Sequence, residues 1–398
     1  MIKISPSNIS LIGNILARKL SFLSTILILS FFGEDIYADY VKIIAIFSLL
    51  VMPVNEAYSH AITEKYPTIT GFGNNIIITL TIFTVGILLY SYLEDSFSLD
   101  SQAITEHLFL LLLCCIGIIW LQERNILKME LKIKKHVFLY DIITPICFPF
   151  AFICVNLIGN IHNSLNIVAL IAVLSLLSMT FIFRKPREAQ KQHISLKKFF
   201  EYYVIAISTG QSTNVILIIS SSYLTVSDFA TLSIIIKVST FIITPNIMQT
   251  QISIPKTKHM IITNQLGEIL NCFHQLRYKS VITSMIIATI VYYFMFIVFS
   301  PQLPTLYNVN AKYIALFFMV QVMVVWVGPV SSLSIALGDS LTPAYLNIIK
   351  LVSIIFLLTQ VSEIDSMLIQ LTLITLAYLF ALNATKYYKI KRELSNGH

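Results

Sequence analysis

Charged residues are scarce in this chain of 398 residues. Asp, Glu, Lys and Arg make up only 12% of the sequence, whereas 56% of the residues are hydrophobic. An ordinary soluble domain has about 25% charged residues, because polar groups must cover its surface. The composition therefore argues against a soluble enzyme, a secreted domain and a disordered chain.

Residue patterns that bind metals or nucleotides are also missing. The 12 glycines form no phosphate-binding loop, and the 8 histidines form no H-E-x-x-H motif. The 5 cysteines have neither metal-ligand spacing nor the arrangement of a disulfide framework. The sequence thus predicts no cofactor, no metal site and no hydrolysis of ATP by this chain.

Long apolar runs recur along the whole chain. A helix needs about 20 apolar residues to cross a bilayer, and each run is close to that length. The sequence therefore predicts an all-α integral membrane protein with about 12 transmembrane helices. The predicted spans are 10–32, 40–60, 75–93, 103–122, 139–159, 164–183, 200–222, 229–247, 280–300, 313–338, 343–360 and 366–385.

The distribution of Lys and Arg predicts the orientation. With a cytosolic N-terminus, the cytosolic segments carry 21 of these residues, and the outer loops carry only Lys312. Cytosolic loops of membrane proteins carry such an excess, so both termini are predicted to be cytosolic. The net charge of +7 has the same explanation, and no nucleic-acid partner is expected.

A weak internal repeat divides the chain into halves. A shift of 192 residues places Tyr37-Ala38 on Phe229-Ala230 and Pro53 on Pro245. We therefore predict two six-helix lobes, 1–183 and 200–398, around a central cavity, with a basic cytosolic linker at 184–199. Two lobes of equal orientation are a common plan of transporters.

Five cations lie inside predicted spans, and one of them, Lys42 at the outer end of its span, is expected to snorkel to the headgroups. Lys237 and Lys350 are near the middle of their spans, and Arg18 and Lys19 are about 12 Å into the first one. Because a charge in hydrocarbon is costly, a water-filled cavity is favoured for the two lysines over a buried ion pair. For Arg18 and Lys19, a cavity and snorkelling to the headgroups remain equal alternatives. Cations facing one cavity would suit a phosphate or pyrophosphate.

The seventh span contains the polar stretch 208–214, which includes Gln211 and Asn214. Seven such residues cannot all face lipid without a large cost. They could line a hydrophilic lumen that hydrogen-bonds sugar hydroxyls, or they could serve close packing of helices. The lumen is the favoured interpretation.

Three segments carry a family resemblance. They are Asn14-Ile-Leu-Ala-Arg18-Lys19, Phe32-Gly33-Glu34-Asp35-Ile36-Tyr37, and Asp228-Phe229-Ala230-Thr231-Leu232 leading into Lys237. With these, the chain resembles the polysaccharide-unit flippases of the MOP superfamily of exporters, to which MATE transporters also belong. The family often has glycine after the tyrosine, where this chain has Ala38. Arg18 and Lys237 match cavity cations of the family by position, whereas Lys350 is added because of its depth.

The resemblance implies a transporter in the bacterial inner membrane. Its substrate would be an undecaprenyl-pyrophosphate-linked oligosaccharide, an O-antigen or capsule unit moved from the cytosolic to the periplasmic leaflet. Arg18, Lys19, Lys237 and Lys350 would bind the pyrophosphate. Asn14, Gln211 and Asn214 would contact the rest of the head group. A glycan polymerase and a chain-length regulator would be further partners.

Three other functions compete with a flippase, and one of them, a non-transporting membrane scaffold, would leave the cavity cations unexplained. A membrane polymerase or ligase of the same glycan pathways would need a large outer loop, but no predicted outer loop exceeds 13 residues. A cation-coupled drug antiporter of the same superfamily would need a carboxylate deep in a span. Glu56, Asp141 and Glu201 lie at predicted span ends, so the sequence supplies no such residue.

Overall fold

The description below covers a large part of the chain. A computed structural model of the protein describes residues 6–64, 203–204, 206–207, 211–262, 266–299, 301, 303–336 and 341–387. The chain divides into two compact units, Met1–Ile28 with Ile43–Gln211, and Leu29–Lys42 with Ser212–His398. The predicted lobe boundary at 184–199 lies outside the described residues and stays a prediction.

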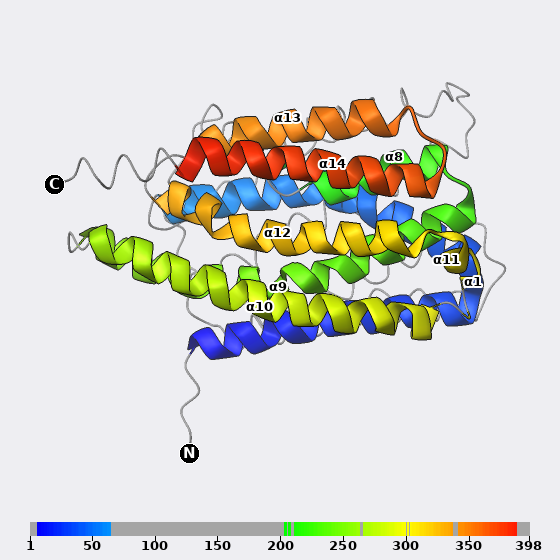
Figure 1. Cartoon of the computed structure of the whole chain (residues 1–398), viewed down its shortest axis with the longest axis horizontal. Coiled ribbons are helices and arrows are strands. Elements are labelled where there is room, and N and C mark those ends of the chain that lie inside the picture. Colours follow the sequence, from blue (N-terminus) through cyan, green and yellow to red (C-terminus); the bar gives the residue numbers. More distant parts are fainter. Residues whose placement is uncertain are drawn as a thin grey trace, which may run out of the picture. The chain divides into compact units, whose positions relative to one another are not determined.

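The described elements are helices, and no strand occurs among the described residues (Figure 1). The α-helices are α1 (Pro6–Glu64), α8 (Ser212–Tyr223), α9 (Val226–Ile262), α10 (Leu266–Phe299), α11 (Thr305–Asn308), α12 (Ala311–Ala336), α13 (Leu341–Leu358) and α14 (Ile364–Leu382). A short π-helix, η2 (Asn383–Tyr387), follows α14 directly.

The helices coincide with the predicted spans where both are described. The first two spans both lie in α1, and the spans after residue 200 fall on α8, α9, α10, α12, α13 and α14. The spans between residues 75 and 183 lie outside the described residues. The segments long and apolar enough to cross a membrane are Phe22–Val54, Val226–Pro245, His274–Phe299 and Ile364–Thr385, and Ala311–Val327 and Tyr345–Leu358 are shorter apolar helices.

The segment between the predicted spans 229–247 and 280–300 is helical over most of its length. Helix α9 continues to Ile262, and α10 begins at Leu266. At 1.5 Å per residue, the 37 residues of α9 are about 55 Å long, which exceeds the hydrocarbon thickness of about 30 Å. Helix α9 is therefore longer than a single crossing of the bilayer requires.

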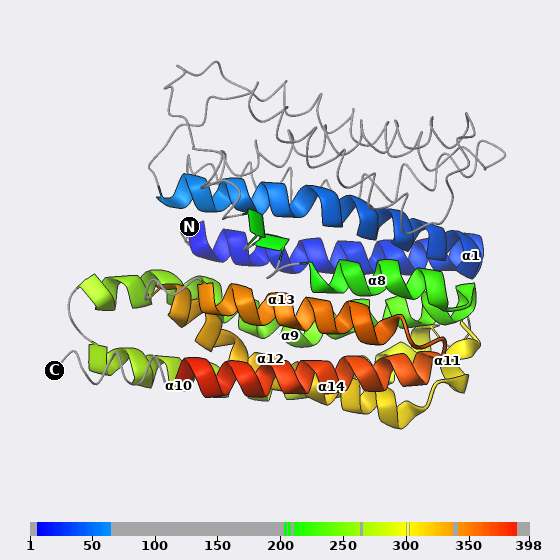
Figure 2. The same cartoon turned by 90° about the horizontal axis from the view of Figure 1, so that it is seen from above.

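Helix α9 forms the centre of the second unit. Its residues Ala230, Leu232, Ile234, Ile235 and Ile242 are fully buried. It packs against α10 and α12, while α12 and α13 both contact α14, and α13 also contacts α8. The axes of these helices are nearly parallel or antiparallel to one another (Figures 1 and 2). A helix that is apolar on all sides belongs in such a central position.

Helix α10 has two different faces. One face carries a stripe of large exposed side chains, Ile282, Ile286, Ile290, Tyr293 and Ile297. This spacing of three and four residues marks a single side of the helix, which suits contact with lipid.

The opposite face of α10 carries Ser280, Ser284 and Ala288, which are buried. Small residues at this spacing allow close approach of two membrane helices. Ser284 Oγ donates a hydrogen bond of 2.7 Å to the Ile242 carbonyl of α9. This face therefore attaches α10 to the central helix.

A bend in α1 brings residues 29–42 into the second unit. Gly33 interrupts the helix with φ 78° and ψ −176°, and the two helical arms beside it run in opposite directions (Figure 2). Ser227 of α9 donates a hydrogen bond of 2.6 Å to Glu34. The hydroxyls of Ser233 and the buried Tyr37 are hydrogen-bonded at 3.1 Å. The bend is thus held against α9 by polar contacts.

Helix α11 extends this polar contact. The hydroxyl of Thr305 is hydrogen-bonded to that of Thr231 at 2.6 Å and to that of Ser227 at 3.1 Å. Glu34, Ser227, Thr231 and Thr305 therefore form one connected cluster, which we call the α1–α9 cluster. In the predicted topology it lies at the outer ends of the spans.

Replacing Gly33 tests the bend. A Cβ at this position would meet no atom within 4 Å, so the cost of Gly33→Ala comes from the backbone conformation alone, a positive φ with an extended ψ that is essentially confined to glycine. We expect Gly33→Ala to lower the free energy of unfolding by about 1–3 kcal/mol, measured in detergent solution. Gly33→Asn should cost about as much, because Asn tolerates a positive φ only where ψ is about +30 to +60°. A clearly smaller loss for Asn than for Ala would contradict the explanation.

Candidate lipid-head-group site

Lys350 lies in the middle of the apolar helix α13. Asn347, Lys350 and Ser353 follow one another at intervals of three residues, so they share one side of the helix. All three are partly buried. They form a polar stripe on a helix that is otherwise dominated by Leu, Ile, Val and Phe.

Tyr378 of α14 faces this stripe. The Lys350 ammonium lies 5.0 Å from the centroid of the Tyr378 ring. A cation this close to an aromatic face is stabilised by the ring quadrupole, and more strongly where water is excluded. The Tyr378 side chain is also hydrogen-bonded to Asn347. Tyr378 therefore fixes the position of the lysine relative to both helices.

A pocket of about 470 Å³ lies at this point between α13 and α14. Lys350, Ser353 and Tyr378 supply its polar groups. Its other lining residues are apolar, namely Leu346, Ile349, Leu357, Leu373, Ile374, Ala377 and Ala381. One ammonium group and hydroxyl donors in an apolar wall can bind a phosphate that carries a hydrocarbon chain.

Lys237 lies elsewhere in the same unit. It is on α9 between the buried residues Ile236 and Val238, and its own side chain is only partly buried. Its carbonyl accepts a hydrogen bond of 2.7 Å from Thr240 Oγ1. Lys237 does not line the pocket around Lys350.

The other predicted site residues have separate positions. Gln211 is buried just before α8, and Asn214 is partly buried in the first turn of α8. Neither lines the pocket around Lys350. Asn14, Arg18 and Lys19 lie in α1, but their side chains are outside the described set. Their roles stay predictions.

Carboxylates in the described part lie at span ends. No Asp or Glu occurs among the buried residues described. Glu34 belongs to the α1–α9 cluster, and Asp365 accepts a hydrogen bond of 3.0 Å from the Asn310 backbone amide. The side chains of His, Cys, Asp and Glu residues also form no cluster that could bind a metal ion within the described part of the chain.

Tyr378 and Asn347 are parts of the site that the sequence analysis missed. An isolated Tyr or Asn in an apolar run carries no signal of its own. The spacing of three between Asn347 and Lys350 could have indicated a shared face, but the partner helix could not be known. Only the packing of α13 on α14 brings Tyr378 to the lysine.

The lysine–tyrosine contact can be tested by comparing two substitutions. Tyr378→Phe keeps the ring over Lys350 and loses the hydrogen bond to Asn347, whereas Tyr378→Leu loses both. We expect Tyr378→Leu to be the less stable variant by about 0.5–2 kcal/mol in thermal unfolding, as for other cation–π pairs. Tyr345→Leu, at an exposed position of α13, is the matched control. Equal stability of the Phe and Leu variants would contradict the contact.

Sequence comparison gives no relatives: no family model matches the chain, and no curated protein does. Solved structures do match. An inward-facing multidrug resistance MATE transporter of the MOP superfamily aligns with a TM-score of 0.63 at 12% identity, over 95% of this chain and 96% of that one. The Vibrio cholerae MATE transporter VcmN, as a D35N mutant, aligns with a TM-score of 0.62 at 12% identity, over 98% of this chain and 96% of that one.

A flippase matches equally well. The lipid II flippase MurJ, in an inward closed conformation, aligns with a TM-score of 0.63 at 15% identity, over 96% of this chain and 89% of that one. Near-complete coverage of both chains at this similarity confirms the predicted fold class. The protein is an all-α, multi-pass membrane protein with the fold of the MOP-type transporters.

Proposed function

We propose that the protein is a flippase for an undecaprenyl-pyrophosphate-linked oligosaccharide, moving an O-antigen or capsule unit from the cytosolic to the outer leaflet. The observation that carries the proposal is the pocket around Lys350, which combines one cation with an apolar wall. It occurs in a fold shared with a protein named as a lipid II flippase. A head group with phosphate and a hydrocarbon tail fits both features.

The cationic side chains have the first role in this proposal. Lys350 and Lys237 bind the pyrophosphate, together with Arg18 and Lys19 of α1. Ammonium and guanidinium groups are suitable because each donates several charge-assisted hydrogen bonds to phosphate oxygens. Lys237 supports this role because a partly exposed charge at mid-span is stable only beside water or another polar group.

The polar side chains have the second role. Asn14, Gln211 and Asn214 hydrogen-bond the sugar hydroxyls, and the prenyl tail stays in the lipid. The two predicted lobes rock around the head group, so that the site opens first to the cytosol and then to the outside. Alternating access of this kind needs no catalytic group in the chain. A polymerase and a chain-length regulator are the expected partners of the pathway.

The second candidate is a cation-coupled drug antiporter, because MATE structures match as well as MurJ. An antiporter of this kind would need a carboxylate within a span. The described residues include no buried carboxylate, whereas they include two mid-span lysines. This balance of charges favours an anionic substrate over a cationic one.

Lysine substitutions test the proposal in a strain that lacks the chromosomal gene. A hydrogen bond to a charged group contributes about 1.5–3 kcal/mol, so Lys350→Ala and Lys237→Ala should each weaken substrate binding roughly 10- to 100-fold. The measured result is loss of surface glycan at matched protein levels. Lys350→Arg and Lys237→Arg keep the charge and should restore most of the export.

Lys312→Ala is the matched control, since Lys312 is exposed in a predicted outer loop. It should support normal export. If both alanine variants are made at normal levels and still export glycan, the cationic site is wrong. If they lose drug tolerance while glycan stays normal, the antiporter is supported instead.

A further inference from the structure

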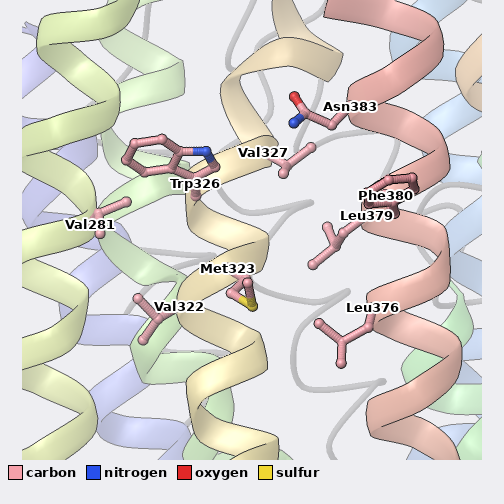
Figure 3. A pocket seen from close by; sticks show the side chains of 9 residues that line it. All are labelled: Val281, Val322, Met323, Trp326, Val327, Leu376, Leu379, Phe380 and Asn383. Atoms are coloured by element: carbon pink, nitrogen blue, oxygen red, sulfur yellow. The ribbon is translucent and has the colours of Figure 1, made fainter.

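A second pocket lies between α12 and α14 and reaches α10. Its volume is about 400 Å³. All lining residues except Asn383 are apolar: Val281, Val322, Met323, Trp326, Val327, Leu376, Leu379 and Phe380. Figure 3 shows Leu376 near one end of the pocket and Asn383 near the other, both on the chain segment of α14 and η2. We call this pocket the α12–α14 groove.

The groove opens on the outside of the helix bundle. Trp326 is 44% exposed and Phe380 is 80% exposed, although both line the groove. Large apolar side chains at this exposure contact lipid in a membrane protein. The groove is therefore accessible to a lipid chain from the side, without passage through the protein.

One end of the groove carries positive charge. Arg277 of α10 lies one helical turn before the lining residue Val281, and its guanidinium carbon is 3.9 Å from the Trp326 ring centroid. Lys279 is exposed, but it lies two residues after Arg277 and therefore on another side of α10. Asn383 lies at the same end of the groove, because Figure 3 shows it toward the end where Trp326 lies and away from Leu376. The lining residues and these neighbours include no carboxylate.

The same end has the features of a membrane interface. Tyr278 is exposed next to Lys279, and aromatic and basic residues gather where the hydrocarbon meets the headgroups. The predicted topology places this end of α10 on the cytosolic side. In addition, α14 changes from an α-helix to the π-helix η2 at Asn383, and such irregular turns are frequent at functional sites.

We propose that the α12–α14 groove binds an anionic phospholipid of the cytosolic leaflet. One acyl chain lies along Leu376, Met323 and Leu379. The phosphate lies at the basic end, where the guanidinium of Arg277 provides charge and Asn383 provides an amide donor. Basic sites between membrane helices on the cytosolic side recognise anionic lipid headgroups in this manner.

A phospholipid fits this groove better than the head group of the transport substrate. The wall offers one polar side chain, which is too few for a chain of sugars. The opening toward lipid and the basic end together select a membrane lipid with a phosphate. This inference does not rest on the proposed transport activity, since a drug antiporter with the same groove would bind the same lipid.

Tryptophan fluorescence gives a direct test. The chain contains 2 tryptophans, Trp120 and Trp326, so Trp120→Phe leaves only the tryptophan of the groove. The full-length variant is reconstituted in phosphatidylcholine vesicles that contain a minor fraction of phosphatidylglycerol. Bromine atoms on the acyl chains of either lipid quench a tryptophan that they touch. We expect brominated phosphatidylglycerol to quench Trp326 more strongly than brominated phosphatidylcholine at the same fraction.

Substitutions in this background then locate the lipid. Val281→Phe and Leu376→Phe fill the groove from two different helices, and either should remove the excess quenching. Ile290→Phe, at an exposed position of α10 outside the groove, should leave it unchanged. Arg277→Gln should reduce the preference for phosphatidylglycerol, whereas Lys279→Gln, on another side of α10, and Lys312→Gln, in a predicted outer loop, should not.

Three results would overturn the proposal. Equal quenching by both lipids in the parent would show that the groove has no preference for an anionic headgroup. Unchanged excess quenching in both groove-filling variants would place the lipid elsewhere. Displacement of brominated phosphatidylglycerol by a lower concentration of a polyprenyl phosphate would assign the groove to the carrier lipid. Monodisperse elution and helical circular dichroism confirm that each variant is folded.

Discussion

The cost of an unpartnered polar group in hydrocarbon is the constraint on which this structure depends. Hydroxyl side chains on α9 avoid this cost by local hydrogen bonds. Ser233, Ser239 and Thr240 each donate a hydrogen bond to the backbone carbonyl three residues earlier. Charged groups cannot be satisfied in this way, so they need an aromatic ring, a ligand or water. Lys350 has the Tyr378 ring and a pocket beside it. A charged group without a purely local solution is for this reason a candidate for ligand binding.

The α1–α9 cluster connects this constraint to the internal repeat. Glu34 and Ser227 are 193 residues apart, and Tyr37 and Ser233 are 196 apart, close to the shift of 192 that aligns the two halves. These hydrogen bonds hold the glycine bend at Gly33 against α9, within one compact unit.

Much of the fold could be predicted because lipid imposes a simple rule of about 20 apolar residues per helix. The spans at α12, α13 and α14 were predicted within a few residues, whereas α8 begins at Ser212 instead of residue 200, and α9 and α10 extend into 248–279. The site was less predictable. Depth in a span singled out Lys350 as a candidate, but its proximity to Tyr378 depends on how α13 packs on α14. The apolar composition of a span is a property of one segment of the sequence, whereas the packing of α13 on α14 depends on the side chains of two segments together.

The most direct test of the central claim is to delete the gene in its host and determine where the undecaprenyl-linked units accumulate. The proposed flippase predicts loss of surface glycan, with single oligosaccharide units held on the cytosolic leaflet. Restoring the gene should return these units to the surface polymer. Single units on the outer leaflet would contradict the account and indicate a polymerase. Normal glycan together with altered drug or cation tolerance would contradict it as well, and would assign the MOP-type fold to an antiporter.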